Sequence, residues 1–346
     1  MQKDFHFHLV YALAREAGFE HKKANIIAYS SQYVDDNTDR YHKVEIKGRE
    51  VNTKLDPIIG TGDKRFHLII TQLADINLSN VTKPFDFDVQ RFIYAPFHFL
   101  PAEYTIAEEE IKTIEKKMGF YNPLATFQDC QNARELVTNA MKEDDPYKLG
   151  IALHIYADTW SHSRFSGFQE PWNNVEKGLS LTKLLPDIGH AELKHTPDVI
   201  SESWTDKRFK DKVENDKKAL GALEQIYKFL CENNNTWQDI KNDFKEFINA
   251  KDYSRRIELI QDKYKELTMY DPDLWAKEAF IFKLGKGEFY PFYKPSESEP
   301  VDERVYTTHQ VVEITPRSNF EKTNLYRFQV AAKQVLGSVL NKIEML

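Results

Sequence analysis

Residues 149–168 read LGIALHIYADTWSHSRFSGF and carry three side chains that commonly bind metals, His154, Asp158 and His162. Each follows the previous one by four residues, and such a step advances an α-helix by only about 40° around its axis. The three side chains are therefore predicted to project from one helical face. Because the neighbouring residues are mostly apolar, this face is predicted to be buried, where unpaired imidazole and carboxylate groups are costly. A divalent metal such as zinc, which accepts nitrogen and oxygen ligands, is the simplest partner for them.

The composition argues against some classes of protein. The chain has 346 residues, of which 41% are hydrophobic, and its 47 Lys and Arg against 54 Asp and Glu give a formal net charge of −7. This length and apolar content suffice for a sizeable core, in one large domain or two ordinary ones. A mildly acidic chain without a basic stripe is not expected to grip nucleic acid through many phosphate contacts. Nucleic acid is therefore disfavoured as a partner.

The cysteines and the first residues bear on location. Cys130 and Cys231 lie far apart and match no metal or disulfide spacing, so we expect free thiols in a reducing compartment. The first residues, MQKDFHFHLVYALAREAGF, lack the features of a signal peptide, and no apolar run is long enough to cross a bilayer. We therefore expect a cytoplasmic protein without a transmembrane segment. The oligomeric state is not determined by the sequence.

Helix signals dominate the chain, so a mostly α fold is predicted. Asp145 precedes Pro146, a pair typical of a helix start, and it opens the helix that contains His154. Two stretches alternate as strands do: residues 43–52, which predict a hairpin around Gly48, and residues 305–315, which are rich in β-branched side chains. Apolar residues recur at helical spacing in residues 9–18, 21–32 and 318–344.

Changes in charge and in proline content divide the chain into three predicted segments. Residues 1–204 form a metal-binding helical core. Residues 205–294 form a highly charged helical insertion or subdomain that packs on one side only. Residues 295–346 comprise a linker, short strands and a C-terminal helix that packs back on the core.

Further candidate ligands lie near the start of the chain. His6 is flanked by phenylalanines, which favours a buried position, whereas His8 is expected to be solvated. An apolar helix ends in the adjacent carboxylates Asp35 and Asp36. Acidic residues are unfavourable at the negative end of a helix dipole unless a cation lies nearby, and a metal ion would satisfy that need.

Other candidates follow in the first two hundred residues. His98 is enclosed by apolar residues between two prolines, a setting that is also typical of a hydrogen-bonded core histidine, and His67 is its rival as a ligand. His190 and Asp198 lie in loop-like sequence, where functional side chains are common. Arg164 could clamp a phosphate, although a solvated position at the helix end is the simpler interpretation.

The stretch LGIALHIYADTWSHSRF resembles the central-helix motif of the zinc-dependent phospholipase C and P1/S1 nuclease superfamily, and its form is closest to the heterokaryon-incompatibility C-like branch. The DFH start, SQYVDD and GHAELKHTPD also resemble a bacterial family of unknown function within or near that superfamily. The resemblance covers about residues 1–200. It implies a multi-helix core with a zinc site, to which the patterns described above add one or two small β-hairpins and a C-terminal helical extension.

The resemblance also implies the roles of particular residues. One of Asp35 and Asp36 would bridge two ions, and the other would orient water as a general base. The implied metal ligands, in chain order, are His6, Asp36, His98, His154, Asp158, His162, His190 and Asp198.

The chain departs from the superfamily pattern at three points. The superfamily uses an N-terminal tryptophan whose free amine binds zinc, whereas this chain begins with Met1. The second histidine of the superfamily's helix lies six residues after the aspartate, whereas His162 lies four after Asp158. Lys194 stands where a late carboxylate is expected, so Asp198 would substitute for it. We therefore expect one to three zinc ions, with Mn²⁺ or Fe²⁺ as alternatives.

Clustered divalent ions suit phosphoester hydrolysis, because one ion can activate water while another stabilises the phosphoryl and leaving oxygens. We therefore expect a metal-dependent hydrolase of phospholipase C or nuclease type. Its substrate would be a small phosphodiester or phosphomonoester, or a phospholipid-like molecule. Two alternatives stay open: a non-catalytic, metal-stabilised scaffold or partner-binding protein whose site is closed, and a metal-free core of paired His and Asp.

Overall fold

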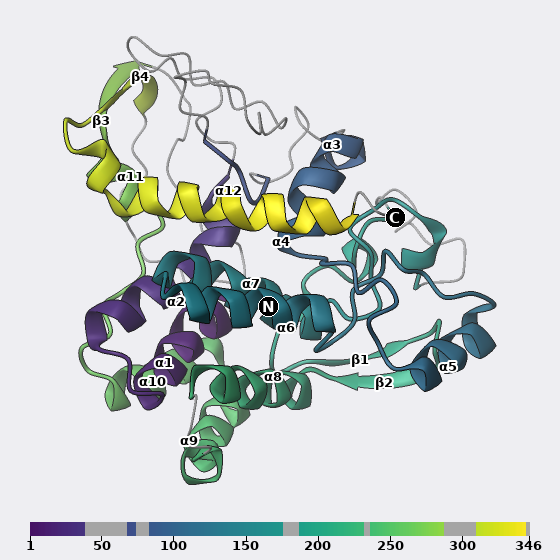
Figure 1. Ribbon diagram of the computed structural model, residues 1–346. Helices are drawn as coiled ribbons and strands as arrows, with labels where there is room; N and C mark the ends of the chain where they lie inside the picture. Colours follow the sequence, from purple (N-terminus) through teal and green to yellow (C-terminus); the bar gives the residue numbers. More distant parts are fainter. Residues whose placement is uncertain (39–67, 74–82, 176–186, 232–235, 287–308, 344–346) are drawn as a thin grey trace.

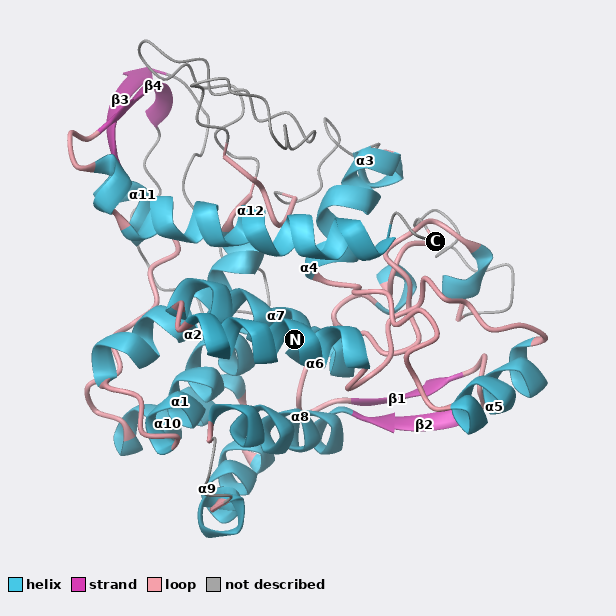
Figure 2. Ribbon diagram, viewed as in Figure 1, coloured by secondary structure: helices cyan, strands magenta, loops and turns pink. Residues whose placement is uncertain are grey.

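The computed structural model describes residues 1–38, 68–73, 83–175, 187–231, 236–286 and 309–343. The fold is mostly α, as predicted, and small antiparallel hairpins lie at its edges (Figure 2). The helices run η1 Asp4–Leu9, α1 Val10–Glu16, α2 His21–Asp36, α3 Phe87–Val89, η4 Gln90–Tyr94, α4 Ala95–Phe97, α5 Glu108–Met118, α6 Gln131–Glu143, α7 Pro146–Ser161, α8 Asn215–Leu230, α9 Trp237–Asn249, α10 Tyr253–Lys263, α11 Leu274–Ala279 and α12 Asn324–Ile343. Short 3₁₀ turns include η8, Thr196–Asp198.

The central helix is α7, and its surroundings explain why its sequence is apolar on nearly every side. It packs against α2, α6, α8 and α12, so that it lies in the middle of the bundle (Figure 1). It starts as predicted: the side chain of Asp145 accepts hydrogen bonds from the backbone N–H groups of Tyr147 and Lys148, and Pro146 occupies the first turn. Leu153, Ile155 and Ala157 are at most 1% exposed.

The closest approach of α7 to α2 occurs at Gly150. A Cβ atom at this position would lie 2.3 Å from the carbonyl oxygen of Ile27 and 2.5 Å from the Cβ of Ser30. Only glycine therefore permits this crossing of the two helices. His154 lies one turn beyond Gly150 on α7, and Asp35 lies one turn beyond Ser31 on α2, so the close crossing brings these two side chains together.

A single hydrophobic core extends through all three predicted segments. Leu153 from the first, Leu223 from the second and Phe328 from the third belong to the same cluster of buried apolar side chains. The described part of the charged segment 205–294 therefore contributes buried apolar side chains to this core. Both cysteines are free thiols, as expected.

The strands agree with the sequence analysis in part. β3 (Phe280–Lys286) pairs antiparallel with β4 (His309–Pro316), which overlaps the predicted strand of residues 305–315. The hairpin of β1 (Ser203–Asp206) and β2 (Asp211–Glu214) was not predicted. The hairpin predicted at residues 43–52 lies outside the described residues.

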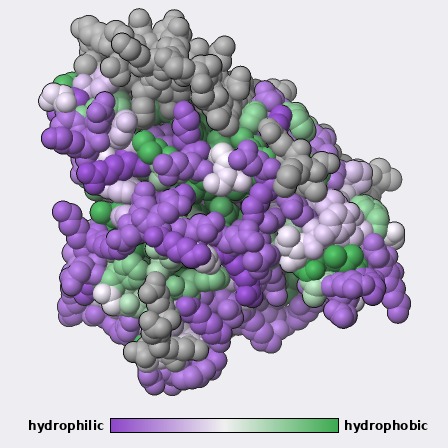
Figure 3. All heavy atoms as spheres, in the orientation of Figure 1, coloured by the Kyte–Doolittle hydropathy of each residue, from purple (hydrophilic) through white to green (hydrophobic). Residues whose placement is uncertain are grey.

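Hydrophilic side chains cover most of the face shown in Figure 3, with apolar residues scattered between them. Among the described residues, no helix combines the length and the apolar character needed to cross a membrane.

Candidate metal centre

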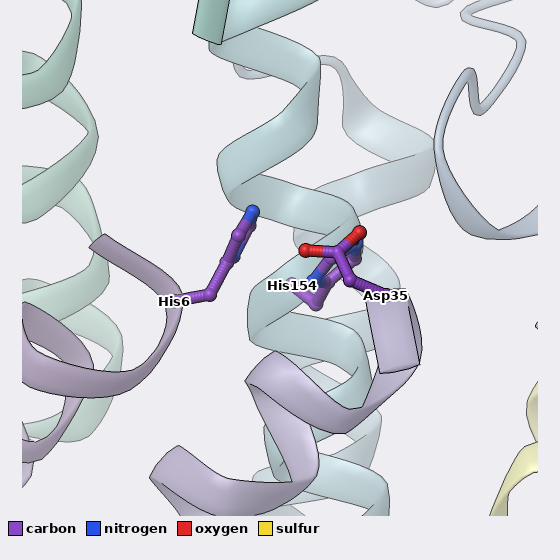
Figure 4. Close-up of side chains that lie close together, drawn as sticks. All are labelled: His6, Asp35 and His154. Atoms are coloured by element: carbon purple, nitrogen blue, oxygen red, sulfur yellow. The ribbon is translucent and has the colours of Figure 1, made fainter. Parts of the chain in front are cut away.

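Histidine and aspartate side chains from five parts of the chain converge beside α7. They form groups of three in which one nitrogen or oxygen atom per residue lies within 4.8 Å of the others. Figure 4 shows one of these groups, to which η1, the end of α2 and the middle of α7 each contribute a side chain. Within the described residues the groups are His6, Asp35 and His154; His98, His154 and Asp158; and His162, His190 and Asp198.

Asp158 lies at the middle of the cluster and is only 1% exposed. Its Oδ1 lies 3.2 Å from Nε2 of His6. Its Oδ2 lies 3.2 Å from Nε2 of His154 and 3.3 Å from Nδ1 of His98. Nδ1 of His162 is slightly more distant from Oδ2, at 3.6 Å. One carboxylate is thus shared by four imidazole rings, an arrangement in which a few bound cations would each find nitrogen and oxygen ligands.

Backbone carbonyl groups determine which ring nitrogen of three histidines faces the cluster. A carbonyl oxygen only accepts hydrogen bonds, so the nitrogen beside it carries the hydrogen, and in a neutral ring the other nitrogen has the free lone pair. Nδ1 of His98 and Nε2 of His162 and of His190 are the nitrogens left free in this way, and all three face carboxylates. The bonds to the carbonyl oxygens are His98 Nε2 to Thr71 (2.8 Å), His162 Nδ1 to His98 (2.7 Å) and His190 Nδ1 to Lys194 (2.8 Å).

The electrostatic surroundings keep several of these groups in the protonation state that binds metals. Burial lowers the pKa of His6 well below its usual range and lowers the pKa of His154 and of His190 to about 4, so these rings are neutral at pH 7. Burial raises the pKa of Asp158, but His162 and the chain's α-amino group outweigh it and hold this pKa well below the usual range. Neutral imidazoles and an ionised carboxylate are the forms that ligate divalent metals.

Two groups show the opposite shift. Burial lowers the pKa of His98, but the carboxylates of Asp158 and Asp35 reverse this effect and raise the pKa above its usual value. Burial, together with the charge of Asp158, raises the pKa of Asp35 well above its usual range, although His98 opposes the shift. Without a metal, the charge-dense inner part of the cluster therefore favours retaining protons between its ligand atoms.

The α-amino group of Met1 lies inside the cluster, against α7 (Figure 1). It is 2.6 Å from Oδ1 of Asp158 and 3.2 Å from Oδ1 of Asp198. Burial lowers the pKa of this amine, but Asp158, Asp198 and Asp35 together raise it to about 11. At pH 7 this amine is therefore protonated, and it pairs with these carboxylates without offering a lone pair to a metal ion.

The two adjacent carboxylates at the end of α2 take different directions. Oδ1 of Asp35 lies 3.8 Å from both His98 Nδ1 and His154 Nε2. Oδ2 of Asp36 instead accepts hydrogen bonds from the hydroxyl group of Tyr270 (2.7 Å) and from Nε2 of Gln32 (3.1 Å). The prediction of Asp36 as a metal ligand is therefore not met by the geometry, and Asp35 occupies that place. Neighbouring residues of an α-helix point about 100° apart, so only one of the pair can face α7.

Other candidates are also placed by the structure. His8 is not solvated: it is 3% exposed, its Nδ1 lies 3.3 Å from the carbonyl oxygen of Lys3, and burial lowers its pKa to about 3. Arg164 pairs with Asp211 at 2.9 Å rather than extending into solvent. His67, the rival of His98, lies outside the described residues.

Several residues around the cluster were missed by sequence reasoning. The buried guanidinium group of Arg256, on α10, donates to the carboxylate of Asp4 and to the carbonyl oxygen of Phe247, and so ties η1, which carries His6, to the charged segment. Thr71 reaches His98 from a distant part of the chain, and Tyr270 reaches Asp36, which adjoins the cluster residue Asp35. These contacts join residues that no local pattern relates.

The comparison with known proteins identifies a family whose function is unknown. Residues 1–343 match the model described as a family of unknown function, DUF6765. The chain belongs to this family. No curated protein and no solved structure matches the chain. The family match spans all three predicted segments, in agreement with the core that they share.

Proposed function

We propose that this member of DUF6765 is a metal-dependent phosphoester hydrolase whose centre holds divalent ions, with zinc the metal that best suits the nitrogen and oxygen ligands. The observation that carries the proposal is a buried set of candidate ligand atoms that face one another, some of them without a hydrogen-bond partner among the described residues. His6 is fully buried, and neither of its ring nitrogens has a hydrogen-bond partner among the described residues. Its Nε2 lies 3.2 Å from Asp158, but not in the direction of a hydrogen bond.

The residues present fit divalent metals on chemical grounds. Nε2 of His154 lies 3.4 Å from Nδ1 of His98. With Thr71 accepting the hydrogen of His98 Nε2, Nδ1 of a neutral His98 directs its lone pair at the carboxylate of Asp158. Facing lone pairs repel unless a proton or a cation lies between them. Two ligand atoms that share one ion with bonds of about 2.0–2.2 Å lie at most about 4.4 Å apart. The distances from Asp158 Oδ2 to His154 Nε2 (3.2 Å) and to His98 Nδ1 (3.3 Å) meet this limit.

The side chains divide the work that such a reaction needs. Bound divalent ions would lower the pKa of water towards neutrality and stabilise phosphoryl oxygens. Asp35 approaches both inner groups, and its side chain is 27% exposed, so it is placed to hold an ion and to orient water. His190 and Asp198, at 13% and 14% exposure, form the more open group, where a substrate oxygen could reach the ligands. A small phosphoester or phospholipid-like substrate follows from the resemblance of residues 149–168.

A non-catalytic, metal-stabilised scaffold is the second candidate, and one observation favours it. His6, His154 and Asp158 are at most 1% exposed, as expected for a closed structural site in which the protein supplies every ligand. The two candidates agree on metal binding and differ in whether bound metal supports hydrolysis.

The test measures metal content by elemental mass spectrometry and hydrolysis of bis(p-nitrophenyl) phosphate and p-nitrophenyl phosphate. The wild type is compared with a His154→Ala, Asp158→Ala double variant and with His195→Ala, which removes an exposed imidazole beside the centre. We expect at least one equivalent of zinc and chelator-sensitive hydrolysis in the wild type and in His195→Ala, and neither in the double variant.

Two other results would count against hydrolysis. Metal that is lost in the double variant, without hydrolysis of either ester by the wild type, would favour the scaffold. Absence of metal from the wild type, with an equally stable double variant, would leave the cluster as a metal-free polar core and overturn both candidates.

A further inference from the structure

A buried glutamine interrupts the apolar face of the C-terminal helix. Gln329 lies on α12 next to the core residue Phe328 and is only 3% exposed. Both ends of its amide are used: Oε1 accepts a hydrogen bond from the backbone N–H of Ile69 (2.7 Å), and Nε2 donates to Oδ1 of Asn37 (2.9 Å). The amide therefore joins α12 to the end of α2 and to the short segment of residues 68–73.

Asn37 and Thr71 extend this connection. Nδ2 of Asn37 donates to the carbonyl oxygen of Ile69 (2.7 Å) and to Oγ1 of Thr71 (3.2 Å). The backbone N–H of Thr71 donates to the carbonyl oxygen of Asn37 (3.0 Å). The hydroxyl group of Thr71 donates to the carbonyl oxygen of Val34 (2.6 Å). The backbone of Thr71 is thus held on several sides, and all of these bonds are buried or partly buried.

The last bond of the network reaches a candidate ligand. The carbonyl oxygen of Thr71 accepts a hydrogen bond from Nε2 of His98 at 2.8 Å. That bond places the hydrogen on Nε2 and directs Nδ1 towards Asp158. In metal sites, a partner on the far nitrogen of a histidine fixes its tautomer and orientation, and loss of such a partner weakens metal binding about 10–100-fold.

We propose that Gln329 is a positioning residue of the metal centre: its amide holds the Thr71 carbonyl group where it fixes the tautomer and direction of His98. The inference rests on the proposed function, because it requires His98 to be one of the metal ligands. It extends that proposal to α12, a part of the chain to which the resemblance does not reach. It also gives a reason for burying a polar amide in a face that otherwise consists of residues such as Phe328 and Ala332.

The test compares zinc affinity, measured by competition with a chromophoric chelator, between the wild type and two methionine variants. Gln329→Met keeps the length of the side chain and removes both hydrogen bonds. Gln334→Met is the matched control, because Gln334 is exposed on the same helix. We expect one class of zinc to bind more weakly to Gln329→Met, by no more than the about 10–100-fold loss that follows removal of a direct partner of a metal-binding histidine, and wild-type binding to Gln334→Met. Unfolding in excess chelator, followed by circular dichroism, shows separately how much each variant is destabilised without metal.

The outcomes separate this inference from the proposed function. A merely structural glutamine would lower the stability in chelator and leave zinc affinity unchanged, and that result would overturn the inference alone. A wild type that binds no zinc would overturn the proposed function and, with it, the role of Gln329. If Gln329→Met does not fold, Gln329→Glu serves instead, because it retains an acceptor for Ile69 and cannot donate to Asn37. Wild-type zinc affinity in that variant would also contradict the inference.

Discussion

Asp206 and Asp158 are both 1% exposed, and the protein surrounds these two carboxylates in different ways. Asp206 faces one guanidinium group: Nε of Arg208 donates to Oδ1 (3.0 Å) and Nη2 to Oδ2 (2.8 Å), while Nη1 donates to the carbonyl oxygen of Trp172 (2.9 Å). The guanidinium carbon also lies 4.3 Å from the centre of the Phe165 ring. Asp158 instead faces several imidazole rings and the α-amino group of Met1.

The difference shows which buried carboxylate is fully compensated by side chains of the protein. At Asp206, the donors of one arginine match the acceptors in number and direction, which is what a buried ion pair needs to be tolerated. Around Asp158, the ring nitrogens of His6 and Nδ1 of His154 have no hydrogen-bond partner among the described residues. A buried polar network that is only partly satisfied is unfavourable for folding. If the proposed function holds, metal binding gives a reason for the chain to retain it.

The largest expected effect comes from breaking the balanced pair. Arg208→Met leaves Asp206 buried without its counter-charge, so the free energy of unfolding should fall by about 3–5 kcal/mol. Urea denaturation with and without zinc measures it, and the loss should be the same in both conditions. Arg255→Met is the control: its pair with Glu258 is 58% and 61% exposed, and such pairs contribute about 0–1 kcal/mol. A zinc-dependent loss in Arg208→Met would contradict the view that this pair is independent of the centre.

The next effect tests whether the centre depends on the approach of two helices. Gly150→Ala places a methyl group against the carbonyl oxygen of Ile27 and should destabilise the protein by about 1–3 kcal/mol. Because α2 must move away from α7, Asp35 should leave His154, and zinc affinity should fall as well. Calorimetric titration with zinc and thermal unfolding measure the two effects.

Gly337→Ala is the matched control on α12, where no atom lies within 4 Å of the added methyl group. Alanine is a better helix former than glycine, so this variant should gain up to about 1 kcal/mol. If Gly150→Ala bound zinc as the wild type does, the close crossing would not be what positions Asp35.

The ligand-bearing helix could be predicted because its information is local. The spacing of His154, Asp158 and His162, the apolar residues between them and the Asp145–Pro146 start all lie within one stretch, and the structure places the three side chains in one cluster. The local sequence around His98 and His190, together with the order of ligands in the resembled superfamily, selected these two residues as candidates, and the structure brings both into the cluster. Whether any of them binds a metal stays a prediction.

The rest of the centre depends on contacts that sequence patterns do not encode. The choice between Asp35 and Asp36 turns on a helix rotation of about 100°, and the boundary of α2 was not known to that precision from the sequence. Thr71 reaches His98 across a long stretch of chain, while Tyr270 and Arg256 bond Asp36 and Asp4, which lie next to or near cluster residues in the sequence. β1 and β2 are only four residues long each, too short to show an alternating pattern within a charged segment.

The effect that is smallest in the absence of metal gives the sharpest test of the comparison, because its sign should depend on zinc. His6→Leu replaces a buried ring that has no hydrogen-bond partner among the described residues, and an unsatisfied buried group costs about 1–3 kcal/mol. In excess chelator the variant should therefore be as stable as the wild type or about 1 kcal/mol more stable. With zinc the order should reverse, because ligand binding stabilises only the protein that binds it, by about 4 kcal/mol at a thousandfold excess over Kd. The control is His21→Leu, which removes a ring whose Nδ1 lies 2.7 Å from the Tyr11 hydroxyl and should destabilise the protein equally with and without zinc. If His6→Leu behaved as this control does, His6 would be a satisfied core residue, and the contrast between the two buried carboxylates would lose its basis.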